Sequence, residues 1–184
     1  QLTPEVALPL YVAVSTDTGC FVYSNVTANT HRAAAALMET GIDYKAVNKL
    51  HFRTKSKKRL VLEGELLRTM EFYDEDRVVI VAVPQSLQKR MALTEADMED
   101  LAALGGMVEG TDCAVTMKET KDGAWKVSMR TGARVNATLA CSKLGGGGHR
   151  AASGCLIEHA DYETARTQIL NAIAEAVREE QTQA

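Results

Sequence analysis

Four consecutive glycines followed by a histidine and an arginine form the part of this sequence best suited to hold an anion. The candidate phosphate ligands lie in the stretch KLGGGGHRAASG, and they are Gly146, Gly147, Gly148, His149 and Arg150. Glycine allows a backbone to turn successive N–H groups toward one point, and the imidazole and guanidinium add donors. A loose surface loop is the alternative interpretation. The stretch is not a P-loop, because the lysine and hydroxyl residue that end that motif are absent.

A second set of cations follows in the stretch VSMRTGARVN. Arg130 comes at the end of an alternating apolar and polar run, which predicts its place at the end of a strand beside a small turn. Arg134 offers a second positive charge nearby. Arginine side chains are usually exposed, so a solvated arginine at a hairpin edge is the alternative to a ligand contact.

A carboxylate follows an apolar run in the stretch STDTGCF. Asp17 is predicted in a tight turn, where it could ligate a divalent metal, cap a helix or form an ordinary Asx turn. The Asp-Thr-Gly triplet also occurs in aspartic proteases, but those need two facing copies in a β fold, and this sequence has one copy in a helical setting. His31 and Arg32 are close enough in sequence to reach a phosphate near Asp17, although solvated helix residues are more common.

The remaining candidates are weaker, and the composition sets limits on them. His51 and His159 have no evident partner, and Trp125 fits hairpin packing better than stacking on a base. The net charge is −3, so an anion site must be a local cluster. The four scattered cysteines have no metal-ligand spacing, which favours reduced thiols and a cytoplasmic protein. No signal peptide and no apolar run long enough for a membrane span is evident.

These candidates are expected on alternating helices and strands. The first predicted helix begins at Pro4, with Thr3 as its N-cap. Further helices are predicted at residues 28–40, 44–50, 52–73, 95–104, 136–143 and 162–180, and Asp161 is the predicted cap of the last one. Strands are predicted at 77–84 and 153–158, and a hairpin turns at Asp122-Gly123 within residues 113–130. The run RVVIVAVP is continuously apolar, which is typical of a strand buried on both faces.

The order of these elements predicts an α/β protein of two parts. Residues 1–55 form a small helical α/β piece, residues 56–75 a connecting helix, and residues 76–180 an α/β unit with a mixed sheet and an inserted hairpin. The glycine run lies between a helix and a strand of the larger unit, at a junction where ligand sites are common.

Two segments carry a resemblance to a known family. STDTGCFVYSNVTANTHRAAAALMETGID resembles the last segment of the catalytic domain in the DHH phosphoesterases, and VSMRTGARVNATLACSKLGGGGHRAASG resembles their associated C-terminal domain, whose signature is Gly-Gly-Gly-His. The resemblance is greatest to small bacterial enzymes that degrade short oligoribonucleotides and dephosphorylate adenosine 3′,5′-bisphosphate. Other members cleave cyclic dinucleotides or single-stranded DNA.

The resemblance implies roles for particular residues. Asp17 matches the aspartate of the family's final metal-binding motif, in a site that usually holds two manganese ions. The signature residues Gly146 to His149 and the strand residue Arg130 match positions that grip substrate, and Arg150 follows directly. The family's earlier metal motifs, including Asp-His-His, are not found, and a lone aspartate cannot hold two hard ions. Residues 1–55 are then a remnant of the catalytic domain.

We therefore expect part of a metal-dependent phosphoesterase that supplies substrate binding and one metal ligand and is inactive alone. The expected partner is a short RNA oligonucleotide or a small nucleotide and not a membrane, and a homodimer is left open. The first alternative is a nucleic-acid-binding module without catalysis, and the second is a structural half that completes another domain. The choice among short RNA, nucleoside bisphosphate, cyclic dinucleotide and single-stranded DNA also stays open.

Overall fold

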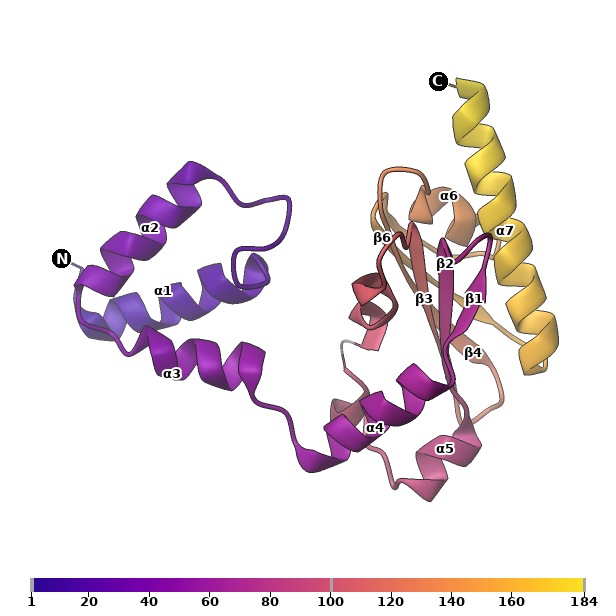
Figure 1. Cartoon of the computed structure of the whole chain (residues 1–184), viewed down its shortest axis with the longest axis horizontal. Helices are drawn as coiled ribbons and strands as arrows, with labels where there is room; N and C mark the ends of the chain where they lie inside the picture. The colour runs from indigo at the N-terminus through magenta and orange to yellow at the C-terminus, as the bar shows by residue number, and fades with distance from the viewer. Residues whose placement is uncertain (1, 100, 184) are drawn as a thin grey trace. The chain divides into compact units, whose positions relative to one another are not determined.

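The computed structural model describes residues 2–99 and 101–183, and the chain divides into two compact units (Figure 1). The first unit is Gln1–Ser56 and the second is Lys57–Ala184. None of the described helices combines the length and the apolar character that crossing a membrane requires.

The first unit consists of helices around a small apolar core. Its elements are α1 (Pro4–Asp17), α2 (Ala28–Glu39), α3 (Tyr44–Asn48) and the π-helical turn η1 (Lys49–Arg53). Its core residues are Ala7, Tyr11, Ala34, Leu37, Ile42 and Val47. The described residues 2–56 include no strand, so the α/β character of the chain lies in the second unit.

The second unit is a six-stranded mixed sheet with helices on its faces, which confirms the expected fold class. The strands are β1 (Glu71–Tyr73), β2 (Val78–Val83), β3 (Cys113–Glu119), β4 (Trp125–Thr131), β5 (Gly147–His149) and β6 (Ala152–Ile157). Their order is β1-β2-β3-β4-β6-β5. Only the β2–β3 pair is parallel among the described strands. The helices are α4 (Lys57–Arg68), α5 (Gln85–Arg90), α6 (Ala137–Ser142) and α7 (Tyr162–Gln183).

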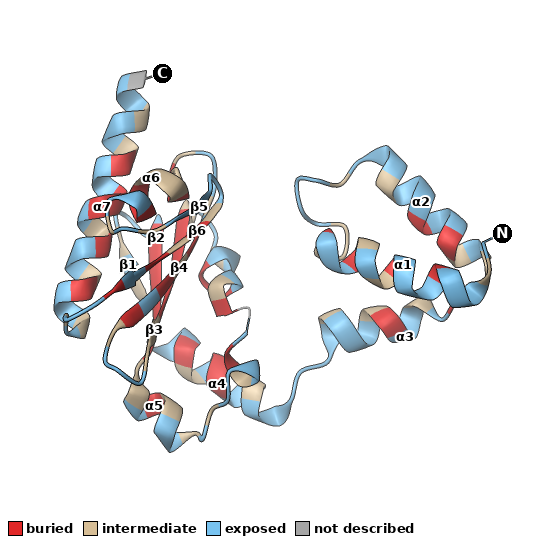
Figure 2. Cartoon of the chain, turned by 180° about the vertical axis from the view of Figure 1, so that it is seen from behind, coloured by how far each residue is buried: buried red, intermediate tan, exposed pale blue. Residues whose placement is uncertain are grey.

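The two faces of the sheet are covered differently. The helices α6 and α7 pack on one face, where alternate residues of β2, β3, β4 and β6 form the larger core (Figure 2). On the other face, Leu62 and Leu66 of α4 pack on Val79 and Val81 of β2. The strand β2 is therefore buried on both faces, as its continuous apolar run predicts. The polar residues of β4 that alternate with its core residues lie on this second face.

Two segments differ from the sequence-based prediction. The helix expected to run to residue 73 ends at Arg68, because Phe72 and Tyr73 pair with Val79 and Val78 as an edge strand. The helix expected over residues 95–104 is replaced by the 3-10 turns η2 (Ala96–Met98), η3 (Leu101–Ala103) and η4 (Gly105–Met107). Residue 100, within that expected helix, lies outside the described residues.

Close packing against the sheet explains the 3-10 turns. These turns place Met98, Leu101 and Leu104 on the sheet. Gly105 approaches it so closely that an added Cβ would lie 3.0 Å from Cβ of Ala114.

Candidate functional site

The glycine run is fixed in place by hydrogen bonds from the elements on either side of it. Asn136 caps α6 by accepting from the N–H groups of Thr138 and Leu139, at 3.1 and 3.2 Å. The hydroxyl of Thr138 then donates to the carbonyl of Gly148 at 3.2 Å, and the hydroxyl of Ser153 donates to the carbonyl of His149 at 2.9 Å. The last residues of the run pair with β6 as the short strand β5. The run is thus a defined strand edge in this structure.

The glycines of the run differ in what requires them. An added Cβ on Gly146 would lie 2.2 Å from the carbonyl oxygen of Gly154, and one on Gly148 would lie 2.6 Å from that of Ala152. Gly148 also has a φ of 151°, which a side chain disfavours. An added Cβ on Gly147 would meet nothing within 4 Å. Packing explains two of these glycines, and the third leaves open space at the surface.

Arg130 and His149 come into register across three neighbouring strands. Arg130 of β4 pairs with Ala152 of β6, and Ala152 pairs with His149 of β5. Directly paired residues point to the same side of a sheet, so the Arg130 and His149 side chains share one face with the small Ala152 between them. Two strand spacings separate their Cα atoms by about 10 Å. The next row contains Ser128, Gly154 and Gly147, which gives this face a floor almost without side chains.

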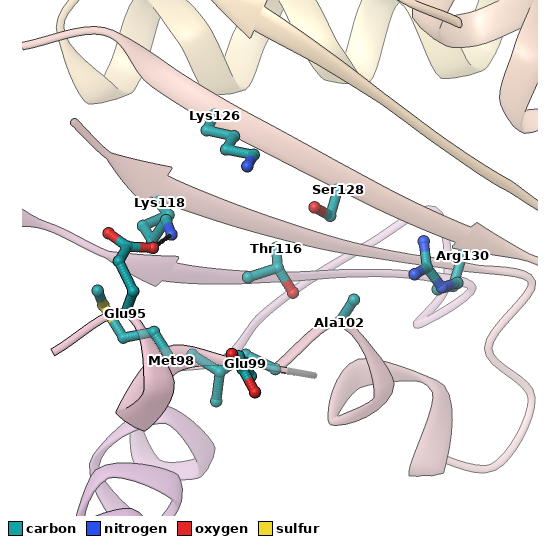
Figure 3. Close-up of a pocket in the computed structure, with 10 residues that line it drawn as sticks. Glu95, Met98, Glu99, Ala102, Thr116, Lys118, Lys126, Ser128 and Arg130 are labelled. Carbon is teal, nitrogen blue, oxygen red and sulfur yellow. Dashed lines mark hydrogen bonds and ion pairs between the residues drawn. The ribbon is translucent and has the colours of Figure 1, made fainter. Parts of the chain in front are cut away.

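A cavity of about 310 Å³ continues this face toward β3. Figure 3 shows Lys126, Ser128 and Arg130 along β4, with Lys118 and Thr116 on β3. The opposite wall carries Met98, Leu101 and Ala102 together with two carboxylates, Glu95 and Glu99. The cavity lining is therefore mixed, with apolar surface on one wall suited to a base or ribose and cations on β3 and β4 suited to phosphate.

The two lysines of this cavity differ in their pairing. Lys118 forms a short ion pair with Glu95, drawn as a dashed line in Figure 3, and this hydrogen bond lowers the pKa of that carboxyl. Lys126 and Arg130 form no ion pair with any residue that the structure describes, although Arg130 donates to the carbonyl of Met129 at 3.1 Å. The free positive charge of the face therefore lies on β4.

The other two arginines predicted near the site are held in ion pairs. Arg150 contacts both carboxylate oxygens of Glu180 on α7, and this hydrogen-bonded pair raises the pKa of the guanidinium. Arg134 bridges Asp74 and Asp112 at 3.2 Å each, and the Asp112 hydrogen bond raises its pKa. Both guanidinium groups thus tie loops to neighbouring elements.

Asp17 lies in the first unit, at the C-terminal end of α1 rather than within the turn that follows. Its Oδ2 accepts from the side-chain amide of Asn25 at 3.1 Å. The imidazole of His31 stacks on Phe21, with ring centroids 5.2 Å apart. Residues 2–99 and 101–183 contain no group of three histidine, cysteine, aspartate or glutamate side chains that could hold a metal ion. Among the described residues, Asp17 therefore does not form a metal site by itself.

The structure also places the weaker candidates and adds residues that the motifs did not indicate. Trp125 is buried on the α7 side of the sheet, with its ring 5.3 Å from that of Tyr162, so it does not line the open face. His51 and His159 are exposed. Lys126 and Gly154 belong to the open face, but neither is among the candidate site residues of the sequence analysis. The alternation in WKVSMR is the signal that could have indicated Lys126.

Comparison with known proteins finds a domain model and curated relatives that match this chain. The DHHA1 domain model matches residues 78–179. The bifunctional oligoribonuclease and PAP phosphatase NrnA of Thermus thermophilus is 35% identical over 185 residues, covering 100% of this chain and 53% of the relative. The probable enzyme of the same name from Streptococcus mutans is 25% identical over 154 residues, covering 84% of this chain and 49% of the relative.

A solved structure shows a similar fold. An exopolyphosphatase-related protein from Bacteroides fragilis has a TM-score of 0.86 at 22% identity, covering 94% of this chain and 51% of that protein. This chain thus spans about half the length of the curated relatives that it matches.

Proposed function

Because the chain belongs to the DHH phosphoesterase family through its DHHA1 domain, we propose that it supplies the substrate-binding part of a metal-dependent phosphoesterase. The proposed substrates are short oligoribonucleotides and nucleoside 3′,5′-bisphosphates such as PAP. The Thermus and Streptococcus relatives are named as oligoribonucleases and PAP phosphatases. The observation that carries the proposal is the Arg130–Ala152–His149 row, in which a guanidinium and an imidazole flank a small residue on an open face.

Each element of this face has a defined part in holding a phosphodiester. Arg130 offers a planar set of donors that matches two phosphate oxygens, and His149 adds a donor from the other side. The glycines at positions 146–148 bring the backbone of β5 close to the substrate, and Gly147 leaves the space that the substrate occupies. Arg150 contributes through its pair with Glu180, which fixes the end of the run.

The proposed metals need ligands beyond the described residues. Asp17 is proposed as one ligand of a centre of two divalent ions, with manganese as the proposed metal, but the described residues offer no further ligands around it. When bound, such ions activate water and stabilise the oxygens of the transition state. We propose that this chain by itself binds substrate without hydrolysing it. The proposed location of the protein is the cytoplasm.

Binding by the chain itself tests the first part of the proposal. The 184-residue chain is titrated with 5′-phosphorylated diadenylate and with PAP while amide shifts are followed by NMR. Binding is expected to shift the amides of β4, β5 and β6, and His149→Ala should weaken it about tenfold through loss of a charge-assisted contact. His51→Ala, which removes an exposed histidine of the first unit, is the matched control. Equal effects of the two substitutions would contradict the assignment.

Hydrolysis tests the second part. With manganese present, the chain alone should release no mononucleotide from diadenylate. Joined behind the N-terminal half of the Thermus relative, it should gain activity that Asp17→Asn abolishes and Asp43→Asn leaves unchanged. Turnover by the chain alone, or activity that survives Asp17→Asn, would overturn this part.

A binding module without catalysis is the second candidate function. One observation favours it. Arg130, His149, Gly147 and Gly154 all belong to the second unit and to the span that the DHHA1 model matches. Nucleotide binding that persists in the joined protein without any manganese-dependent turnover would support the module over the phosphoesterase.

A further inference from the structure

The open face of β4 carries a regular series of polar side chains that extends beyond the Arg130–His149 row. Residues 130, 128 and 126 alternate with Met129 and Val127, which are buried in the core. Each step of two residues along a strand covers about 7 Å. Successive phosphates of an extended single-stranded nucleic acid are separated by a similar distance. The strand therefore offers positions for phosphates at a repeating interval.

The last position of the series is a cation that forms no ion pair or hydrogen bond with any described residue, although its charge helps to lower the pKa of Glu95. Lys126 is exposed, and its neighbour on β3, Lys118, is already paired with Glu95. Lys126 and Ser128 line both the cavity next to β3 and the hollow above Gly154 on β6. Their side chains thus stand between two depressions of the same face. Figure 3 shows both residues directed into the cavity.

We propose that Lys126, one step along β4 beyond Ser128, forms an additional phosphate subsite that selects oligoribonucleotides of at least three nucleotides. The proposal rests on the proposed function, because it takes the Arg130–His149 row as the position of one phosphate. Ser128 then faces the next phosphate and Lys126 the one after it. The apolar wall formed by Met98, Leu101 and Ala102 lies across the cavity and can cover a base.

Ligand length decides which phosphates reach this subsite. PAP and 5′-phosphorylated diadenylate each carry phosphates one nucleoside apart, so they extend from the Arg130–His149 row only to Ser128. A 5′-phosphorylated triadenylate carries a third phosphate and reaches Lys126. The face should therefore bind the triadenylate more tightly than the diadenylate, and the difference should depend on the charge of Lys126.

The experiment compares three ligands with three variants of the 184-residue chain. Dissociation constants for PAP, diadenylate and triadenylate are measured by NMR titration for the wild type, Lys126→Ala and Lys126→Arg. Lys121→Ala removes the same charge from the exposed turn of the same hairpin and is the control. Lys126→Ala should weaken triadenylate binding about tenfold and leave PAP binding within twofold of wild type. Lys126→Arg should retain the preference.

The salt dependence of binding gives a second measurement. Affinity falls with salt concentration, so the slope of log K against log salt concentration is negative. Loss of one phosphate contact to a single strand reduces the size of this slope by about 0.7. Lys126→Ala should show this decrease for triadenylate only. Equal losses for all three ligands, or equal losses in Lys126→Ala and Lys121→Ala, would show general attraction and overturn the subsite while the proposed function stands. A wild-type chain that binds none of the ligands would overturn both.

Discussion

At the scale of single residues, the glycines of the run are needed for two different reasons, close packing within the sheet and open space above it. Gly146 and Gly148 are required by the close approach of β5 to β6, where a Cβ would overlap carbonyl oxygens. Gly147 has no such requirement, yet it lies in the row that contains Ser128 and Gly154. Its missing side chain therefore serves the space above the sheet rather than the packing within it.

This difference predicts opposite outcomes for two single-methyl substitutions. Gly147→Ala should leave the free energy of unfolding unchanged or raise it by about 0.4–1 kcal/mol, because alanine fits the backbone there and restricts the unfolded chain. It should weaken diadenylate binding about tenfold, since the methyl group projects into the ligand space. Gly146→Ala should cost at least about 2 kcal/mol through overpacking. Urea unfolding and NMR titration measure both effects, and a destabilised Gly147→Ala with normal affinity would contradict this assignment.

At the scale of elements, the last turns of α7 hold both ends of the glycine run. Lys143 before the run pairs with Glu175 and Glu179, and Arg150 after it pairs with Glu180. Glu175 and Glu179 are four residues apart and so lie on one side of the helix, and Glu180 lies about 100° further round it. The helix thus acts on the site by holding a loop, without contacting the open face of the sheet.

Removing these charges should loosen the run selectively. The double substitution Glu179→Gln and Glu180→Gln is expected to speed amide hydrogen exchange over residues 145–149 and to weaken diadenylate binding severalfold. Exchange in the core strands β2 and β3 should not change. Glu158→Gln, at an exposed position before α7, is the control. Tighter binding by the double variant would instead show that Arg150, once released, contacts the substrate directly.

A second polar cluster joins the edge strand β1 to α7. Glu71 accepts hydrogen bonds from the hydroxyls of Tyr162, at 2.6 Å, and Tyr73, and from the guanidinium of Arg166, at 3.0 Å. Burial alone would raise the pKa of Glu71, but these three donors outweigh it and lower the pKa. Burial, followed by the hydrogen bond to Glu71, raises the pKa of Tyr73 to about 12. The cluster therefore favours an ionised Glu71 between neutral tyrosines.

The sign of this shift predicts an acid-sensitive contribution to stability. The folded state binds the proton of Glu71 less tightly than the unfolded state, so the contribution is full above the ordinary glutamate pKa and is lost as the pH falls through the lowered value. Glu71→Gln should cost about 1–2 kcal/mol at neutral pH. The difference between the two proteins, measured by urea unfolding, should shrink as the pH falls below the ordinary glutamate pKa value of 4.5. A difference that stays constant with pH would contradict the assignment.

Local patterns predicted the elements that depend on local chemistry. The hairpin turns at Asp122-Gly123, where Gly123 has a φ of 81°, and Asp161 caps α7 by accepting from the N–H of Thr164 at 2.8 Å. The strands β1 and β5 were missed because each has only three residues and exists through its partner strand. The same limit applies to the site. Residue type identifies Arg130 and His149, but their register depends on how β4 and β5 pair with β6, and no local signal specifies that pairing.

At the scale of the whole chain, the described candidates divide between the two units. Asp17 belongs to the first unit, whereas Arg130, Lys126 and His149 belong to the second. The second unit has apolar clusters on both faces of its sheet, and the first has a small core of its own. A unit of the first one's size buries a smaller fraction of its surface and is correspondingly marginal. The substrate-binding face should therefore depend on the second unit alone.

This division predicts that residues 57–183 fold and bind ligand without the first unit. The excised unit should unfold cooperatively, with a midpoint within a few degrees of that of the corresponding transition in the whole chain, because both of its apolar clusters are retained. Its dissociation constant for diadenylate should agree with that of the whole chain within about twofold, because the excised unit retains every residue proposed to contact the ligand. His149→Ala in the excised unit should weaken binding by the same factor as in the whole chain. An excised unit that folds but binds tenfold more weakly would show that residues of the first unit contribute to the face.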